Sequence, residues 1–243
     1  MQDEQIFSNI LNSLTGSVPS SVLAPTAAAR ACDALRRQII SFELPPDRIL
    51  SRSELAKEFG LSQTPVRDAL QKLEAEGLVK IYPQSKTIVT RIDPGQIAEA
   101  VFLRRAIEIQ IVRHLAESIT PETLEQLRTI VSLQSTAAKQ ENAIGAFQDL
   151  DEAFHKTMIA AVGFPNLHHL IQSKSGHLNR LRYLDMWDKK KINRILKDHK
   201  VIIEALSERN PDGAADAIRE HLGQTIGKLP ELREANKEYF LEK

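Results

Sequence analysis

The chain has 243 residues, in which 32 Lys and Arg balance 32 Asp and Glu, so the formal net charge is zero. This balance excludes a surface that attracts polyanions as a whole, and any nucleic-acid site must be local. With 42% hydrophobic and 26% charged residues the composition is that of a globular protein, and the length favours two modest domains.

Other counts narrow the class of protein further. The single cysteine, Cys32, excludes an internal disulfide framework and a multi-cysteine zinc motif, which points to a reducing compartment. No apolar run approaches the roughly 20 residues of a membrane span, and the first residues are acidic where a secretory signal is basic. We therefore expect a cytoplasmic protein without a membrane partner.

The N-terminal part of the chain predicts a flexible arm followed by a helix. Residues 1–20 are rich in Ser and show no clear period, so we expect them to form the arm. Thr26 can cap a helix whose apolar residues recur at steps of four and three, namely Ala31, Leu35, Ile39 and Phe42.

Two short helices are predicted next, separated by a tight turn. Ser51 and Glu54 have the spacing of a capping box and open the first of them, and Gly60 supplies its left-handed end. The second helix carries the apolar stripe Val66, Ala69, Leu70 and Leu73 and ends at Gly77. The segments LVKIY and TIVTRI then predict a β-hairpin. Residues 21–93 therefore read as three helices followed by a wing.

The start of the second short helix has the chemistry of a DNA-reading surface. Ser62, Gln63 and Thr64 are polar, and Arg67 lies one turn beyond Gln63 on the face opposite the apolar stripe. Gln can pair with adenine and Arg with guanine when such a helix enters the major groove. The alternative from the pattern alone is a small helical domain in which Arg67 is merely solvated.

From Asp93 onward the pattern is entirely helical, which makes this residue the natural domain boundary. We expect an antiparallel six-helix bundle over residues 94–230 and a C-terminal tail over 231–243. The helices are predicted at about 94–119, 121–139, 142–162, 166–187, 189–208 and 213–228.

Four residues of this bundle could hold a divalent metal ion. Asp151 and His155 are four apart and share one helix face, while His199 and His221 each lie next to the inward side of a later helix. One carboxylate and three neutral imidazoles suit zinc, nickel, cobalt, manganese or iron, with a position left open for water or a substrate carboxylate. The alternative is that these residues never converge. The remaining histidines are assigned to the surface or to packing, namely His114, His168, His169 and His177.

A continuous stretch of about 65 residues resembles the winged helix-turn-helix of the GntR family of bacterial transcription regulators. The fragments ELA, FGLSQTPVRDAL and LEAEGLV follow the order and spacing of that family. The resemblance implies contacts to bases or phosphates of an operator from Ser62, Gln63, Thr64 and Arg67, and a phosphate contact near Arg52 or Ser53. Many members have Arg at the positions of Ser53 and Gln63, and Arg-Gly in the wing where this chain has Ser85-Lys86. Lys86 remains able to contact phosphate.

The second half resembles the FCD ligand-sensing domain of the FadR branch, in its shorter, VanR-like form. The resemblance lies in LRRAIE, LDEAFHKTMIAAVGFPNLHHLI and DHKVIIEALSERNPDGAADAIREHL. It implies a divalent metal, zinc or nickel in first place, at positions matching Asp151, His155, His199 and His221. It also implies a small organic acid as effector, with Arg104 in its pocket.

These resemblances predict a homodimeric bacterial regulator, in the role of a repressor, that binds a palindromic operator and joins the nucleoid when bound to DNA. An enzyme is not expected. The rival hypotheses are a metal-dependent hydrolase, since such a metal can activate water, and an architectural DNA-binding dimer with an empty bundle.

Overall fold

The computed structural model of the chain describes residues 26–83, 85–140, 144–185 and 189–242. The arm expected at residues 1–20 lies outside these ranges. The chain divides into two compact units. We call them the helical unit, which contains Phe102–Leu170 and Met186–Gln224, and the winged unit, which contains Ser21–Val101, Ile171–Asp185 and Thr225–Lys243.

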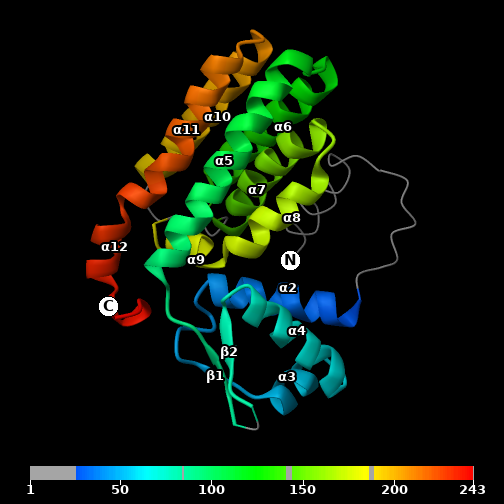
Figure 1. Cartoon of the computed structure of the whole chain (residues 1–243), viewed down its shortest axis with the longest axis vertical. Coiled ribbons are helices and arrows are strands. Elements are labelled where there is room, and N and C mark those ends of the chain that lie inside the picture. Colours follow the sequence, from blue (N-terminus) through cyan, green and yellow to red (C-terminus); the bar gives the residue numbers. More distant parts are fainter. Residues whose placement is uncertain (1–25, 84, 141–143, 186–188, 243) are drawn as a thin grey trace. The chain divides into compact units, whose positions relative to one another are not determined.

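The winged unit contains the predicted three helices and the wing (Figure 1). Its helices are α2 (Ala27–Ile40), α3 (Arg52–Glu58) and α4 (Gln63–Ala75), and its strands are β1 (Ile49–Leu50), β2 (Val79–Ile81) and β3 (Thr87–Val89). The sheet is antiparallel in the order β1-β3-β2, with Val79 opposite Val89. The hairpin is confirmed. Strand β1 was not predicted, because two residues carry no readable period.

Local signals begin α2 and α3 and end α3 as expected. The Thr26 and Ser51 hydroxyls accept hydrogen bonds from the amides of Ala29 (3.1 Å) and Glu54 (3.4 Å), which caps α2 and α3. Gly60 has a φ of +63°, the left-handed conformation that ends α3 at little cost to glycine. α4 begins after Ser62, whose side chain makes no capping bond.

The core of the winged unit lies between α2 and α4. Leu35, Ile39, Val66 and Leu73 are completely buried there, as the predicted stripes require. At the edge of this core Arg36 forms a bidentate pair with Glu76, with Nε to Oε2 at 2.7 Å and Nη2 to Oε1 at 2.8 Å. The pair ties α2 to the end of α4.

The prediction of one helix over 166–187 is wrong. α8 (Pro165–Lys174) ends before Ser175, and α9 (Gly176–Leu184) begins after it. The Ser175 hydroxyl donates to the carbonyl of Ile171 at 2.7 Å, and a Cβ at Gly176 would lie only 2.8 Å from the Leu78 side chain. The break thus brings the start of α9 close to Leu78, a tertiary contact that no local period reveals.

Much of the expected C-terminal tail is ordered structure of the winged unit. It contains most of α12 (Leu229–Ala235) and the whole 3-10 turn η1 (Lys237–Tyr239), and Phe240 pairs with Ile92 in a parallel bridge. Phe240 is 1% exposed and packs in a second apolar cluster with Ile92 and Ile97.

The helical unit is built of long helices that run alongside one another (Figure 1). These helices are α5 (Pro94–Ser118), α6 (Pro121–Ala137), α7 (Ile144–Ala161), α10 (Lys189–Ser207) and α11 (Pro211–Gly227). The first residues of α5 and the last residues of α11 belong to the winged unit. The mainly α fold with an N-terminal winged helix-turn-helix is confirmed. None of the described helices is long and apolar enough to cross a bilayer.

Candidate functional site

The residues predicted to read DNA lie on the surface of the winged unit. Ser62 is the N-cap of α4, and Gln63 and Thr64 form its first turn; all three are exposed. The side chain of Arg67 is 57% exposed and follows one turn later, with its Nε 3.7 Å from Asp68. The N-terminal end of α4 therefore presents polar side chains to solvent, as a recognition helix requires.

The other predicted DNA contacts are also accessible. Arg52 and Ser53 are exposed in the first turn of α3, and Lys86 is exposed at the wing. The Lys86 ammonium lies 5.8 Å from the centre of the Tyr82 ring, a cation–π contact that sequence patterns did not reveal. The contacts of these seven residues with DNA stay predictions.

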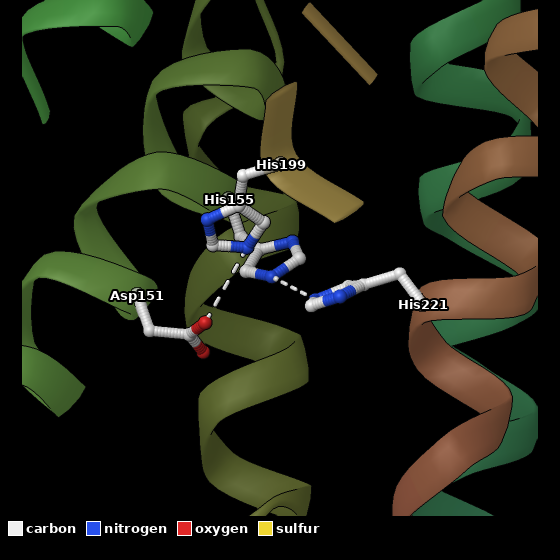
Figure 2. Close-up of side chains that lie close together, drawn as sticks. All are labelled: Asp151, His155, His199 and His221. Atoms are coloured by element: carbon white, nitrogen blue, oxygen red, sulfur yellow. Dashed lines mark hydrogen bonds and ion pairs between the residues drawn. The ribbon is translucent and has the colours of Figure 1, made fainter. Parts of the chain in front are cut away.

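The four predicted metal ligands converge in the helical unit. Asp151 and His155 come from α7, His199 from α10 and His221 from α11. Their ligand atoms all lie within 4.8 Å of one another, and Figure 2 shows the four side chains pointing toward one centre. All four are buried, between 0% and 6% exposed. The helical periods thus placed these residues on inward faces, and packing brought the faces together.

Each of the three imidazoles is held from behind through Nδ1. The Nδ1 of His155 lies 2.6 Å from Glu108 Oε2, that of His199 lies 2.8 Å from Gln134 Oε1, and that of His221 lies 3.4 Å from Asp198 Oδ2. Each of these oxygens accepts a hydrogen bond from Nδ1–H, which leaves the lone pair of the neutral ring on Nε2. The Phe154 ring, stacked at 4.0 Å on His199, fixes that ring further.

The charge of Glu108 is secured by its neighbours. Burial alone would raise the pKa of Glu108, but the guanidinium of Arg104 and the ring of His155 hold this pKa well below its usual range. Arg104 Nε donates to Glu108 Oε1 at 2.7 Å. Burial in turn lowers the pKa of His155 and outweighs the nearby Glu108. His155 is therefore a neutral imidazole at pH 7, the form that ligates a metal.

The inner atoms of the cluster fit a cation. His155 Nε2 and His221 Nε2 are 3.3 Å apart, and His199 Nε2 lies 3.4 Å from Asp151 Oδ1. With Nδ1 protonated on each ring, lone pairs of nitrogen face lone pairs of nitrogen or oxygen, which is repulsive unless a cation or a proton lies between them. Three nitrogens and one carboxylate oxygen are a ligand set for zinc and for other divalent transition metals.

Sequence reasoning missed the three residues behind the imidazoles. Gln134 had a readable signal, because it is a completely buried polar residue on the apolar stripe of α6, in register with Leu127, Ile130 and Val131. Glu108 follows Arg104 by one helical turn. Asp198 offered no signal, since its role depends on where α11 places His221.

Arg104 and the four histidines outside the cluster differ in their exposure. Arg104 is buried and paired with Glu108, so its charge is shared before any effector arrives, and its effector contact stays a prediction. His114 and His169 are exposed. His168 and His177 are buried, at 5% and 2% exposure, and burial is the largest cause that lowers the pKa of each to about 4.

Comparison with known proteins identifies the class to which this fold and these sites belong. Residues 27–89 match the bacterial regulatory proteins of the gntR family, and residues 99–224 match the FCD domain. The first match spans the winged helix-turn-helix, and the second contains all four residues of the buried cluster. The chain belongs to the gntR family of regulators with an FCD domain, and it is a DNA-binding transcriptional regulator.

Curated relatives match most of the chain. A transcriptional regulator of the HTH type from an unstable DNA locus of Streptomyces ambofaciens is 32% identical over 206 residues, 85% of this chain and 86% of its own. The transcriptional repressor RspR of Escherichia coli K12 is 29% identical over 86% of this chain and 91% of its own. The gluconate operon repressor of Bacillus subtilis is 24% identical over 85% and 86%.

Solved structures share the fold. McbR/YncC of E. coli superposes with a TM-score of 0.73 at 19% identity, covering 85% of this chain and 98% of its own. A GntR regulator from Rhodococcus sp. RHA1 gives 0.69 at 19% identity, covering 84% and 97%.

Proposed function

We propose that this regulator is a repressor whose operator affinity is controlled by a small carboxylate effector bound beside a divalent metal ion. The metal would be held by Asp151, His155, His199 and His221. The observation that carries this proposal is the buried convergence of three imidazole Nε2 atoms and one carboxylate, each imidazole being held through Nδ1.

The role of each residue follows from its place. The four ligands bind the ion, while Glu108, Gln134 and Asp198 orient the imidazoles. A bound metal would supply a Lewis acid that attracts a carboxylate oxygen. Arg104 is paired with Glu108, which holds His155, and we propose that it orients the outer part of the effector while it stays in this pair.

The proposed control is thermodynamic linkage. An effector that binds one conformation of the protein more tightly than the other shifts operator affinity by that difference, typically about 1 to 3 kcal/mol. The names of two relatives, which call them repressors, support repression as the outcome. We also propose a homodimer on a palindromic operator, because a single recognition helix contacts few base pairs.

Elemental analysis and zinc titration of the purified protein test the metal site. We expect one zinc or nickel ion per chain in the wild type, none in His199→Ala, and an unchanged content in His169→Ala, which removes an exposed histidine of α8 as the matched control. His199→Ala should also lose the operator response to a panel of small organic acids while it keeps basal DNA binding. Wild-type protein that binds no divalent ion would refute the proposal.

A further inference from the structure

Residues 90–93 link the wing to α5, and α9 holds this linker at two points. Arg180 Nη1 donates to the Thr90 carbonyl at 2.7 Å. The Asp93 amide donates to His177 Nδ1 at 3.1 Å, and His177 Nε2 lies 3.1 Å from the carbonyl of Gly77 at the end of α4. All of these residues belong to the winged unit. α9 therefore joins the end of the recognition helix to the linker.

The C-terminal segment holds the same linker from a second direction. The Ile92 amide donates to the Tyr239 carbonyl at 2.7 Å, and the Leu241 amide donates to the Ile92 carbonyl at 2.9 Å. Phe240, between them, is buried against Ile92. Together the linker 90–93, α9 and residues 229–241 form what we call the linker latch.

One side chain makes the closed latch costly. Arg180 is completely buried, yet its Nε and Nη2 have no hydrogen-bond partner among the residues that the structure describes. Its guanidinium lies 5.3 Å from the centre of the Phe42 ring. Burial lowers the pKa of Arg180 to about 10, and no described carboxylate offsets that effect. A desolvated cation without a counter-charge opposes the conformation that buries it.

A second feature adds strain at the same place. Phe42, just beyond the end of α2, has a φ of +61°, a left-handed conformation that bulky residues rarely adopt. Its ring stacks on Tyr239 at 4.9 Å with an interplanar angle of 15°. The conformation of Phe42 is therefore maintained by packing against the latch, and opening of the latch would release it.

Both holding segments are continuous in sequence with the helical unit. α9 lies between two segments of that unit, and the C-terminal segment directly follows α11, which carries His221. Changes in the helical unit can therefore reach the linker through two separate stretches of chain, in addition to α5.

We propose that the linker latch is a conformational switch, held near its opening point by the buried charge of Arg180, and that its opening lets α4 adjust to operator DNA. A buried cation without a counter-charge raises the free energy of the closed conformation, which keeps the population of the open conformation from becoming negligible. The inference depends on the DNA-binding role of the winged unit and not on the metal, so it is tested on metal-free protein.

Two variants with opposite expected effects test this switch in the full chain. Arg180→Met replaces the charged side chain by an unbranched apolar one and so removes the charge. It should slow hydrogen exchange of the Ile92, Asp93 and Leu241 amides at least tenfold and weaken binding to an operator selected from random duplex DNA at least fivefold. Tyr239→Ala removes the ring that stacks on Phe42. It should speed the same exchange at least fivefold while operator binding stays equal or becomes tighter.

Lys174→Met, which removes an exposed charge at the end of α8, is the matched control and should change neither quantity. A purely structural role for Arg180 predicts the reverse pattern, with faster exchange in Arg180→Met. Faster or unchanged exchange in that variant would overturn the proposal, as would operator affinities that fall together in both variants. These outcomes do not depend on whether the protein binds a metal ion. The failure of one proposal would therefore not imply the failure of the other.

Discussion

Arg67 is the residue on which base recognition is expected to depend most. It is exposed on α4 one turn after the polar N-terminus, and Asp68 at 3.7 Å is its only ion-pair partner among the described residues. We predict that Arg67→Ala weakens operator binding by about 1 to 3 kcal/mol, the usual contribution of a bidentate contact to guanine. Titration at fixed salt measures this change. Arg128→Ala, which removes an exposed charge from α6, should bind like the wild type.

Glu108 illustrates how one residue behind a ligand can tune it. We predict that Glu108→Gln lowers zinc affinity by roughly 10- to 100-fold, because the neutral amide orients His155 less strongly and reduces the basicity of its Nε2. Isothermal titration against a competing chelator measures the change. Glu220→Gln alters an exposed carboxylate beside His221 and serves as the control. Equal zinc affinities in both variants would show that Glu108 does not contribute to zinc binding.

Among the elements, α9 makes the stability of the winged unit depend on pH through His177. Burial is the main cause that lowers the pKa of this ring, and the charge of Arg180 lowers it further. The neutral ring accepts a hydrogen bond from the Asp93 amide and donates one to the Gly77 carbonyl, so a second ring proton would meet a donor. The folded pKa of about 4 is below the unfolded value near 6.5. The stabilisation is therefore complete above pH 6.5 and is lost as the pH falls toward 4.

We predict that this histidine accounts for roughly 2 to 3 kcal/mol of lost stability between pH 7.5 and pH 4.5. His177→Gln, which can both donate and accept, should show a pH dependence smaller by that amount in urea unfolding of the metal-free protein. His114→Gln replaces an exposed histidine of α5 and should keep the full dependence. A wild-type slope in His177→Gln would show that His177 is protonated in the folded state at a normal pKa.

At the scale of the whole molecule, we predict a two-fold symmetric dimer. Paired recognition helices match two half-sites of a palindrome, and one helix alone reads too few base pairs for tight specificity. Sedimentation at micromolar concentration, with and without operator DNA, should give twice the mass of one chain. A single chain under both conditions would contradict the prediction.

Sequence alone determined the features that depend on local chemistry and period. Capping residues such as Ser51 and a left-handed Gly60 delimit the helices of the winged helix-turn-helix, because caps and turns act within four residues. The inward placement of Asp151, His155, His199 and His221 followed from helical spacing and from the resemblance to the FCD domain. The metal role of these residues remains a prediction that the geometry supports.

Only the tertiary structure decided which distant residues meet. Three features depend on contacts between segments separated by many residues. They are the helix break at Ser175, the pairing of Ile92 with Phe240 and the position of Asp198 behind His221. Hydrophobic period records which face of an element is buried but not which element covers it. The same limit applies to the surroundings of Arg180, because its sequence neighbours do not reveal that this cation is packed without a carboxylate partner among the described residues.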